Sequence, residues 1–186
     1  TQIHKQALSL AASWPKSLGF LRLSINVTAG DLAAAGFDAN MQKQIDNVGF
    51  APDRLTLEIT ESELIGNLLA SADILQRLRT TGVRIAIDDF GTGYSSLSYL
   101  KELPVDYLKI DSGLTGDISG SPKDQVVVRS IIDMAHSLDL GVIAEGVETE
   151  GQLKTLAELG CEYFQGFLSA GPLSPDEFEA FALRSN

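Results

Sequence analysis

The stretch from Val83 to Ser96 constrains the fold of this chain more than any other part of the sequence. It opens with the apolar run Val83-Arg84-Ile85-Ala86-Ile87, which has the length and β-branched composition of a buried strand. Two adjacent acids, Asp88 and Asp89, follow directly, and a loop with two glycines comes next. Acids that end a buried strand are typical of a metal site on a parallel α/β scaffold. Asp and Gly are also ordinary turn residues, so a simple turn is the alternative.

Strand-like and helix-like segments alternate along the rest of the chain. Further strands are predicted at Leu21–Val27, Leu55–Thr60, Tyr107–Ile110, Gly141–Glu145 and Tyr163–Phe167. Helices are predicted at Ile3–Trp14, Asp38–Val48, Glu61–Arg79, Lys123–Leu138 and Thr149–Leu159, and from Ser174 onward. The segment Gly113–Ser121 is rich in turn residues and is expected to be the least structured part. This alternation predicts an α/β fold with a parallel sheet.

Composition limits the class of protein. The 186 residues fit one domain, residues 1–186, and 44% hydrophobic residues can bury a sizeable core. A formal charge of −11 argues against a protein that binds a nucleic acid polymer through phosphate contacts alone. Cys161 is the only cysteine, so no internal disulfide can form. No apolar run approaches the length of a membrane span. We expect a cytoplasmic location, which includes the cytoplasmic part of a membrane-bound parent.

Each of the six predicted strands carries a polar or charged side chain, either within the strand or at its end. The set comprises Asn26, Glu58, Asp88 with Asp89, Lys109, Glu145 and Gln165. In a parallel barrel these ends meet on one face, where catalytic residues lie. Carboxylates together with an amide and a lysine form an oxygen-rich set that suits hard divalent cations. Zinc is disfavoured because the chain has only two histidines, both in helical segments.

Each of these residues also has a simpler explanation. Asn26 could cap the turn that follows it, Glu58 could be a charge on an edge strand, and Glu145 could begin a loop. Lys109 could pair with Asp111 at the surface. We favour a shared site because the residues recur at corresponding positions of several strands, and buried strands rarely carry unpaired charges.

The chain resembles the EAL domain, the bacterial phosphodiesterase domain for cyclic di-GMP. The motifs that carry the resemblance are Ile25-Asn26-Val27-Thr28, Leu57-Glu58-Ile59-Thr60-Glu61, Asp88-Asp89-Phe90-Gly91-Thr92-Gly93-Tyr94-Ser95-Ser96, Leu108-Lys109-Ile110-Asp111, Ala144-Glu145-Gly146-Val147-Glu148 and Phe164-Gln165-Gly166-Phe167. The resemblance implies a TIM-like (β/α) barrel with one antiparallel strand. It also implies two Mg²⁺ or Mn²⁺ ions that activate a water for attack on one phosphodiester, which opens the ring of cyclic di-GMP to linear pGpG.

The resemblance also implies a role for each matching residue. Asn26, Glu58 and Asp88 would hold the first metal, and Asp88 would bridge to the second, which Asp89 also binds. Glu145 would act near the attacking water as base or ligand, and Lys109 would orient that water or offset charge on the phosphate. Loop support and substrate contacts are assigned to the remaining set, which is Glu61 (bracing Phe90–Ser96), Glu148, Gln165 and Asp111.

The Glu-Ala-Leu tripeptide that names the family is absent from the sequence. In the family it lies on a strand upstream of the position of Thr1, so we expect an N-terminally incomplete barrel. We therefore expect the isolated chain to hydrolyse cyclic di-GMP poorly or not at all. We also expect it to self-associate, or to keep its fold only alongside the missing N-terminal segment. The alternative function is a catalytically impaired module for cyclic di-GMP binding or dimerisation. Expected partners are cyclic di-GMP, a second copy in a homodimer, and sensory or GGDEF domains in the parent protein.

Overall fold

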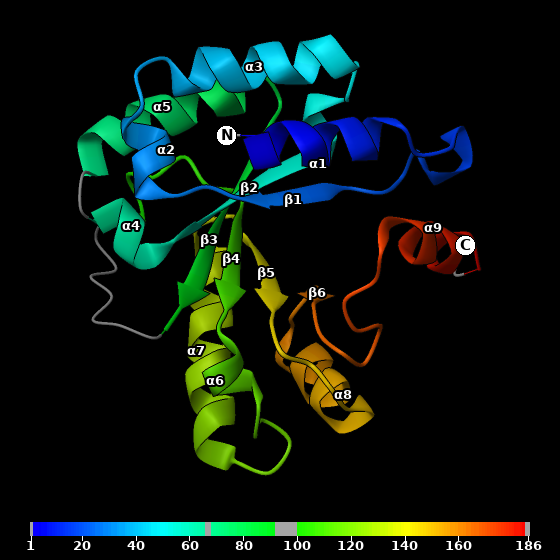
Figure 1. Ribbon diagram of the computed structural model, residues 1–186. Helices are drawn as coiled ribbons and strands as arrows, with labels where there is room; N and C mark the ends of the chain where they lie inside the picture. The colour runs from blue at the N-terminus through cyan, green and yellow to red at the C-terminus, as the bar shows by residue number, and fades with distance from the viewer. Residues whose placement is uncertain (1, 66–67, 92–99, 185–186) are drawn as a thin grey trace.

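The computed structural model describes residues 2–65, 68–91 and 100–184, and its centre is a six-stranded sheet (Figure 1). The strands are β1 Leu23–Asn26, β2 Leu55–Thr60, β3 Arg84–Phe90, β4 Tyr107–Ile110, β5 Gly141–Ala144 and β6 Tyr163–Phe164. They neighbour one another in sequence order, and every pairing is parallel. This confirms the predicted α/β class and gives part of a barrel, with β1 and β6 at the edges. The antiparallel strand that the resemblance implies is not among the strands of the described residues.

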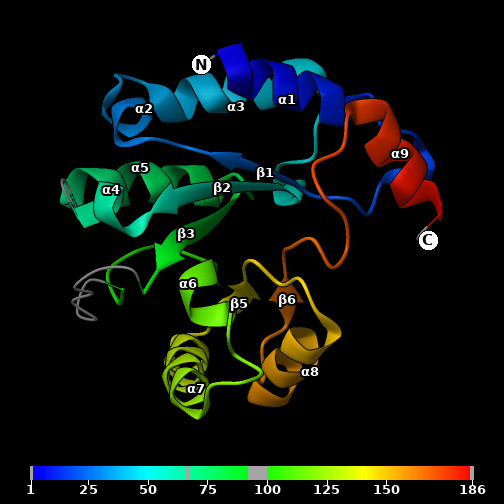
Figure 2. The ribbon, with the colours of Figure 1, turned by 60° about the horizontal axis from the view of Figure 1, so that its bottom comes forward.

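Helices cover the outer face of the curved sheet (Figures 1 and 2). The α-helices are α1 Gln2–Ala12, α2 Ala29–Ala33, α3 Phe37–Val48, α4 Glu61–Ile65, α5 Leu68–Thr80, α6 Ser112–Thr115, α7 Pro122–Ser137, α8 Glu150–Leu159 and α9 Pro175–Arg184. Two short 3₁₀ turns, Lys16–Leu18 and Pro52–Arg54, precede β1 and β2. Within the described residues no helix combines the length and apolarity needed to cross a membrane.

The core lies between the sheet and these helices. Its helix side includes Leu8, Met41, Ile45, Leu75, Val128, Ile132 and Leu156, all buried. Its strand side includes Leu57, Ile85, Ile87, Leu108 and Val142. The helices contribute residues at the three- and four-residue spacing that places them on one face, for example Met41 and Ile45 on α3. The near-continuous burial of β2 follows from its interior place in a parallel sheet.

Three segments differ from the sequence-based expectation. The predicted helix Glu61–Arg79 is present as α4 and α5, with residues 66–67 outside the description. The helix α2 was not predicted; the residue before it, Thr28, is its N-cap, and the Thr28 side chain forms a reciprocal capping box with Asp31. The segment Gly113–Ser121, expected to be rich in turns and the least structured part, differs at its start, where α6 includes residues 113–115. The Asp111 side chain caps α6 by accepting a hydrogen bond from the Gly113 amide at 2.8 Å.

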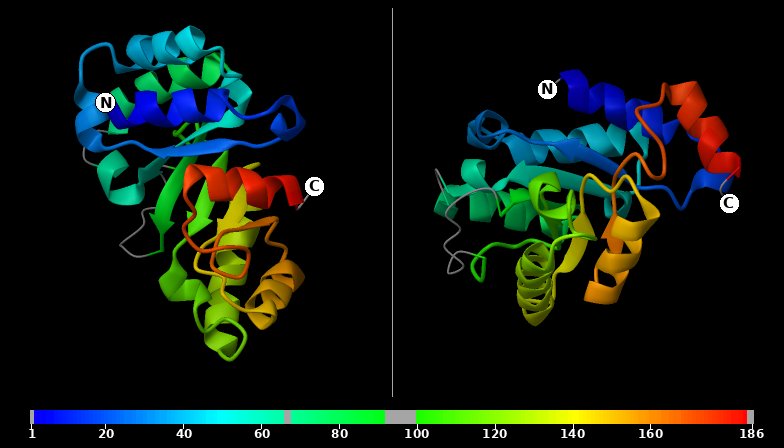
Figure 3. Two further views of the ribbon diagram at one scale, coloured as in Figure 1. Left: turned by 45° about the vertical axis from the view of Figure 1, so that its right-hand side comes forward. Right: turned by 90° about the horizontal axis from the view of Figure 1, so that it is seen from below.

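The last helix, α9, lies beside the C-terminal end of α1 (Figures 2 and 3). Trp14, just after α1, contacts Phe178 of α9 with ring centroids 5.5 Å apart. The C-terminal end of α1 and α9 are therefore in contact, while the N-terminal end of α1 lies away from the C-terminal end of the described chain. The C-terminal ends of the strands lie elsewhere, at the edge of the sheet where the polar residues gather.

Candidate active site

A buried lysine joins the ends of three strands. The Lys109 ammonium on β4 lies 2.9 Å from Glu58 Oε2 on β2, 2.9 Å from Asp88 Oδ1 on β3 and 2.7 Å from Glu145 Oε1 after β5. Lys109 is only 2% exposed. The alternative that it pairs with Asp111 at the surface is therefore wrong. Glu58 lies on an interior strand, so the alternative of an edge-strand charge is also wrong.

The electrostatics of this cluster keep the lysine charged. Burial alone would lower the pKa of Lys109, but hydrogen bonds to Glu145, Asp88 and Glu58 outweigh burial and hold its pKa above the ordinary value. Burial raises the pKa of Glu145, and the negative charges of Asp88 and Glu58 add to that effect, while contact with Lys109 opposes it. One ammonium offsets only one of three carboxylates, so the cluster keeps an excess of negative charge.

A β-bulge places two consecutive aspartates at the same edge of the sheet, beside Lys109. Side chains of neighbouring strand residues normally point to opposite faces. The register between β3 and β4 shifts after Ile87, so that Asp88 and Asp89 stand opposite the single residue Lys109. Asp89 has a positive φ of 55°, in the left-handed region. Its amide donates a hydrogen bond to Asp88 Oδ1 at 3.1 Å.

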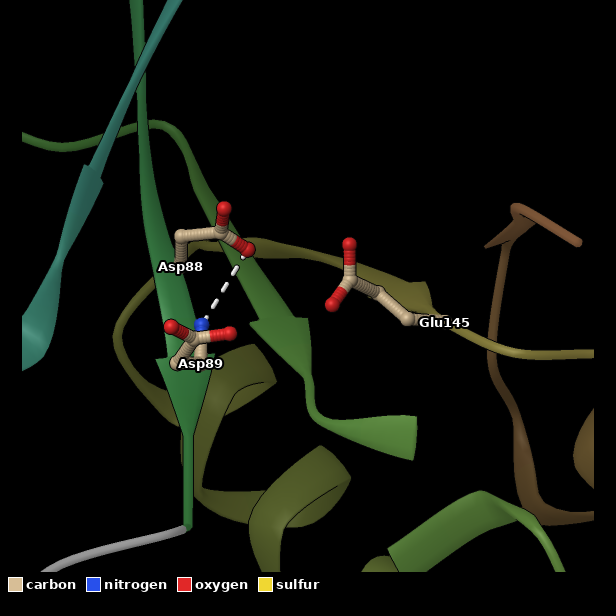
Figure 4. Close-up of side chains that lie close together, drawn as sticks. All are labelled: Asp88, Asp89 and Glu145. Carbon is tan, nitrogen blue, oxygen red and sulfur yellow. Dashed lines mark hydrogen bonds between the residues drawn. The ribbon is translucent and has the colours of Figure 1, made fainter. Parts of the chain in front are cut away.

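The bulge creates a group of three carboxylates that could hold a metal. Oxygens of Asp88, Asp89 and Glu145 lie within 4.8 Å of one another, and Figure 4 shows the Glu145 carboxylate facing the two aspartates. Burial, followed by the charges of Asp88 and Asp111, raises the pKa of Asp89. These are hard oxygen ligands with uncompensated negative charge, which is the donor chemistry that Mg²⁺ and Mn²⁺ prefer. The donor set therefore fits a divalent cation.

The remaining predicted site residues lie around this group. Asn26 is exposed on β1 and is aligned with Glu58 on β2. It does not cap the following turn, because Thr28 is the cap of α2. Glu61 is buried at the start of α4. Most of the loop that Glu61 was expected to brace, residues 92–99, lies outside the described residues.

Three further predicted residues form hydrogen bonds that involve the main chain around the site. Asp111 caps α6, as described above. Gln165 is exposed, and its backbone extends the β6 pairing, with its amide bonded to Ala144 O at 2.8 Å and its carbonyl accepting from Val147 N at 3.1 Å. Glu148 is exposed, and its amide donates to the Gln152 side chain at 2.8 Å.

Sequence reasoning missed three buried polar residues near the site. Thr115 and Gln152 contact the segment that carries Glu145, and the Thr149–Gln152 capping box was the only signal of either. His4 on α1 is 3% exposed, and its Nε2 donates to Asn26 O at 3.2 Å. The helical position of His4 was the reason it was set aside as a zinc ligand, and nothing local in the sequence indicated the contact with β1.

The glycine of the Phe164-Gln165-Gly166-Phe167 motif permits a close backbone approach. A Cβ on Gly166 would overlap the main chain of Val147, lying 2.7 Å from its carbonyl carbon. Val147 O also accepts a hydrogen bond from Leu168 N at 3.0 Å. The segment after β5, which carries Glu145, is thus held directly against the segment after β6.

We expect Gly166→Ala to lower the free energy of unfolding by about 1–3 kcal/mol, because the added methyl forces two backbones apart. Gly171→Ala is the matched control, since a Cβ there meets nothing within 4 Å. Urea denaturation of both variants measures the difference. Equal stability of the two variants would contradict the close approach.

Comparisons with known proteins agree on one family. The family model described as EAL domain matches residues 1–172. The chain is 44% identical over 161 residues to the cyclic di-GMP phosphodiesterase NbdA of Pseudomonas aeruginosa, covering 87% of this chain and 21% of that protein. It is 40% identical over 158 residues to the bifunctional diguanylate cyclase/cyclic di-GMP phosphodiesterase MucR of the same organism, covering 85% of this chain and 23% of that protein. The chain thus spans under a quarter of the length of these relatives.

Solved structures show the same fold. A structure of the MucR phosphodiesterase in complex with cyclic di-GMP superimposes with a TM-score of 0.89 at 36% identity, covering 95% of this chain and 72% of that chain. A manganese and cyclic di-GMP complex of Klebsiella pneumoniae BlrP1 gives a TM-score of 0.81 at 36% identity, covering 88% of this chain and 42% of that chain.

Proposed function

Because this chain belongs to the EAL domain family, we propose that the protein carrying it hydrolyses cyclic di-GMP to linear pGpG with two divalent cations, Mg²⁺ or Mn²⁺. The observation that carries this proposal is the convergence of Glu58, Asp88, Asp89, Lys109 and Glu145 at the C-terminal ends of β2 to β5. Similar proteins named as cyclic di-GMP phosphodiesterases support the substrate, and a similar structure that contains manganese supports the cation.

Four residues are proposed to hold the two cations, and a fifth, Glu145, lies beside them as base or ligand. Asn26, Glu58 and Asp88 are proposed for the first, and Asp88 and Asp89 for the second, with Glu145 close to both aspartates. The bulge at Asp88 and Asp89 supports Asp88 as a ligand of both cations, because it places two consecutive carboxylates at the same edge of the sheet. When bound, two cations offset the charge that develops on the attacking and leaving oxygens of an in-line displacement at phosphorus.

Lys109 and Glu145 are proposed for the remaining chemistry. Glu145 Oε1 contacts Lys109, so the other carboxylate oxygen is the one to accept a proton from the attacking water. The raised pKa of Glu145 makes it a stronger base than an exposed glutamate. Lys109 remains an ammonium, holds the Glu145 carboxylate in place, and offsets negative charge as the phosphate is attacked.

The outer residues are proposed for support. Asp111 caps α6 and adds negative charge near Asp89. Glu148 and Gln165 are exposed beside the site, where the substrate or the outer ligands of the cations would lie. Glu61 is proposed to brace the loop that follows Phe90.

A module that binds cyclic di-GMP or dimerises without cleaving it is the alternative. The presence of every acid in the motifs that the chain contains favours the enzyme, because loss of one metal-binding acid is the direct route to a non-catalytic site. A homodimer and a cytoplasmic location stay predictions. Attached sensory or GGDEF domains are supported by the small share of each relative that the chain covers and by the bifunctional name of MucR.

Product analysis of the parent protein tests this function. Incubation with cyclic di-GMP and Mn²⁺, followed by separation of nucleotides, is expected to yield linear pGpG only when the cation is present. Saturable binding of cyclic di-GMP without any product would favour the binding module instead. A product formed equally well in the presence of a chelator would contradict the two-cation proposal.

A further inference from the structure

A buried polar network outside the carboxylate cluster holds the backbone of Glu145. Thr115, the last residue of α6, is fully buried, and its hydroxyl donates to the Glu145 carbonyl oxygen. On the other side, the Glu145 amide donates to Ile110 O at 3.0 Å. Glu145 thus lies just after β5 with both its backbone polar groups bonded, one to β4 and one to α6.

Gln152 on α8 ties this arrangement together. Its Nε2 donates to Gly116 O at 2.8 Å and to Thr115 O at 3.4 Å, both at the end of α6. Its Oε1 accepts from the amides of Glu148 and Thr149 at 2.8 Å each. Gln152 is 6% exposed, and both ends of its amide are satisfied. A side chain that did no more than cap α8 would not need the second set of bonds to α6.

The helix α6 fits between Gly91, which follows β3, and Gly146, which lies after β5. A Cβ on Gly146 would lie 2.6 Å from Ser112 Cβ, and a Cβ on Gly91 would lie 2.6 Å from Leu114 Cδ1. Both glycines have positive φ, 66° and 100°. This single turn of helix therefore touches the backbone just beyond Asp89 on one side and just beyond Glu145 on the other, so its position sets their separation.

We propose that Thr115 and Gln152 are positioning residues, which fix α6 as a spacer and so hold the Glu145 carboxylate at its distance from Asp88 and Asp89. This inference rests on the proposed function, because it concerns the same cation site. It assigns to Gln152 a role beyond its cap. Residues that hold metal ligands in place affect metal affinity through geometry, and their loss typically weakens it about 10–100-fold.

Two variants interrupt the network at different points. Thr115→Val removes the hydroxyl that reaches Glu145 O while keeping the shape of the side chain. Gln152→Glu keeps an oxygen for the Glu148 and Thr149 amides but removes the donor to the end of α6. Thr115→Ser should restore the wild-type behaviour because it returns the hydroxyl. Thr155→Val is the matched control, since the Thr155 hydroxyl donates only within α8, to Gly151 O at 3.0 Å.

The test combines amide hydrogen exchange with titration of the chain by Mn²⁺ alone. In the Thr115→Val and Gln152→Glu chains we expect faster amide exchange confined to residues 145–149 and at least about 10-fold weaker Mn²⁺ binding. The Thr115→Ser and Thr155→Val chains should match the unsubstituted chain in both measurements. Unchanged exchange at 145–149, faster exchange spread evenly over all strands, or retained Mn²⁺ affinity would each overturn the proposal. Lack of Mn²⁺ binding by the unsubstituted chain would contradict the proposed function. The exchange data would then test by themselves whether Thr115 and Gln152 fix α6 and hold the segment of Glu145.

Discussion

Replacing Lys109 with methionine is expected to lower the free energy of unfolding by about 3–5 kcal/mol, the usual effect of removing one partner from a buried ion pair. The ammonium lies within 2.9 Å of Glu58, Asp88 and Glu145, whose side chains are 10%, 13% and 18% exposed. Without it, three carboxylates would face one another with no compensating charge. Methionine fills a similar volume, so the expected loss is electrostatic rather than a loss of packing.

Urea denaturation in the presence of a chelator measures this loss, and Lys154→Met is the matched control. Lys154 is exposed on α8 and lies 3.9 Å from Glu158, so its replacement should change stability by less than about 1 kcal/mol. Added Mn²⁺ should stabilise the Lys109→Met protein more than the parent, because the cation no longer competes with the ammonium for the same oxygens. A Lys109→Met protein as stable as the control would show that the cluster does not depend on this lysine.

Asp88→Asn is expected to reduce cyclic di-GMP turnover by the parent protein by at least about 10²–10³-fold, since electrostatic stabilisation by cations is worth several kcal/mol and about 1.4 kcal/mol changes a rate tenfold. Asp88 is the carboxylate proposed for both cations. The fold should persist, because the amide oxygen can still accept from Lys109 Nζ and from the Asp89 amide. The change also removes one charge from a cluster with an excess of negative charge.

Asp133→Asn is the matched control, because it makes the same change on the exposed face of α7. It should leave turnover equal to that of the unsubstituted protein. Initial rates at several Mn²⁺ concentrations show whether saturating cation restores the Asp88→Asn enzyme. Near-normal turnover of Asp88→Asn at high Mn²⁺ would contradict the bridging role of Asp88.

The strand ends could be predicted because their pattern is local. The predicted bounds of Leu55–Thr60 and of Tyr107–Ile110 match the observed ones, because each is a short segment rich in strand-favouring residues with a charged residue on either side. Parallel strands that neighbour one another in sequence order bring their C-terminal ends together. Glu58, Lys109 and Glu145 are therefore expected on one face, and the structure places both glutamates in contact with Lys109.

The partners of Lys109 could not be predicted from local sequence. Lys109 and Asp111 are two residues apart and would share a face of an extended strand, which made a surface pair plausible. The partners of Lys109 instead come from β2, from β3 and from the segment after β5. Their contact depends on how the strands are aligned with one another, and the sequence of one strand does not show that alignment. The bulge at Asp88 and Asp89 is equally hidden, because it is defined only by the residues of β4 that stand opposite.

Short helices marked a second limit. Helix α2 is five residues long, and α6 is four, so neither shows a full period of apolar spacing. Each begins with a side-chain cap, from Thr28 and Asp111 respectively, and such caps were the available signal. The polar network of Thr115 and Gln152 depends on α6. Because α6 was not predicted, the contacts that hold the backbone of Glu145 were not predicted either.

Titration of the 186-residue chain with Mn²⁺ by isothermal calorimetry, beside the Asp88→Asn chain, tests most directly whether these strand ends form a divalent-cation site. We expect saturable binding by the parent chain and at least about 10-fold weaker binding after the substitution, because Asp88, Asp89 and Glu145 present their oxygens within 4.8 Å of one another. Absence of saturable binding by the parent chain, or equal affinity of the two chains, would contradict the cation site on which the proposed hydrolysis depends.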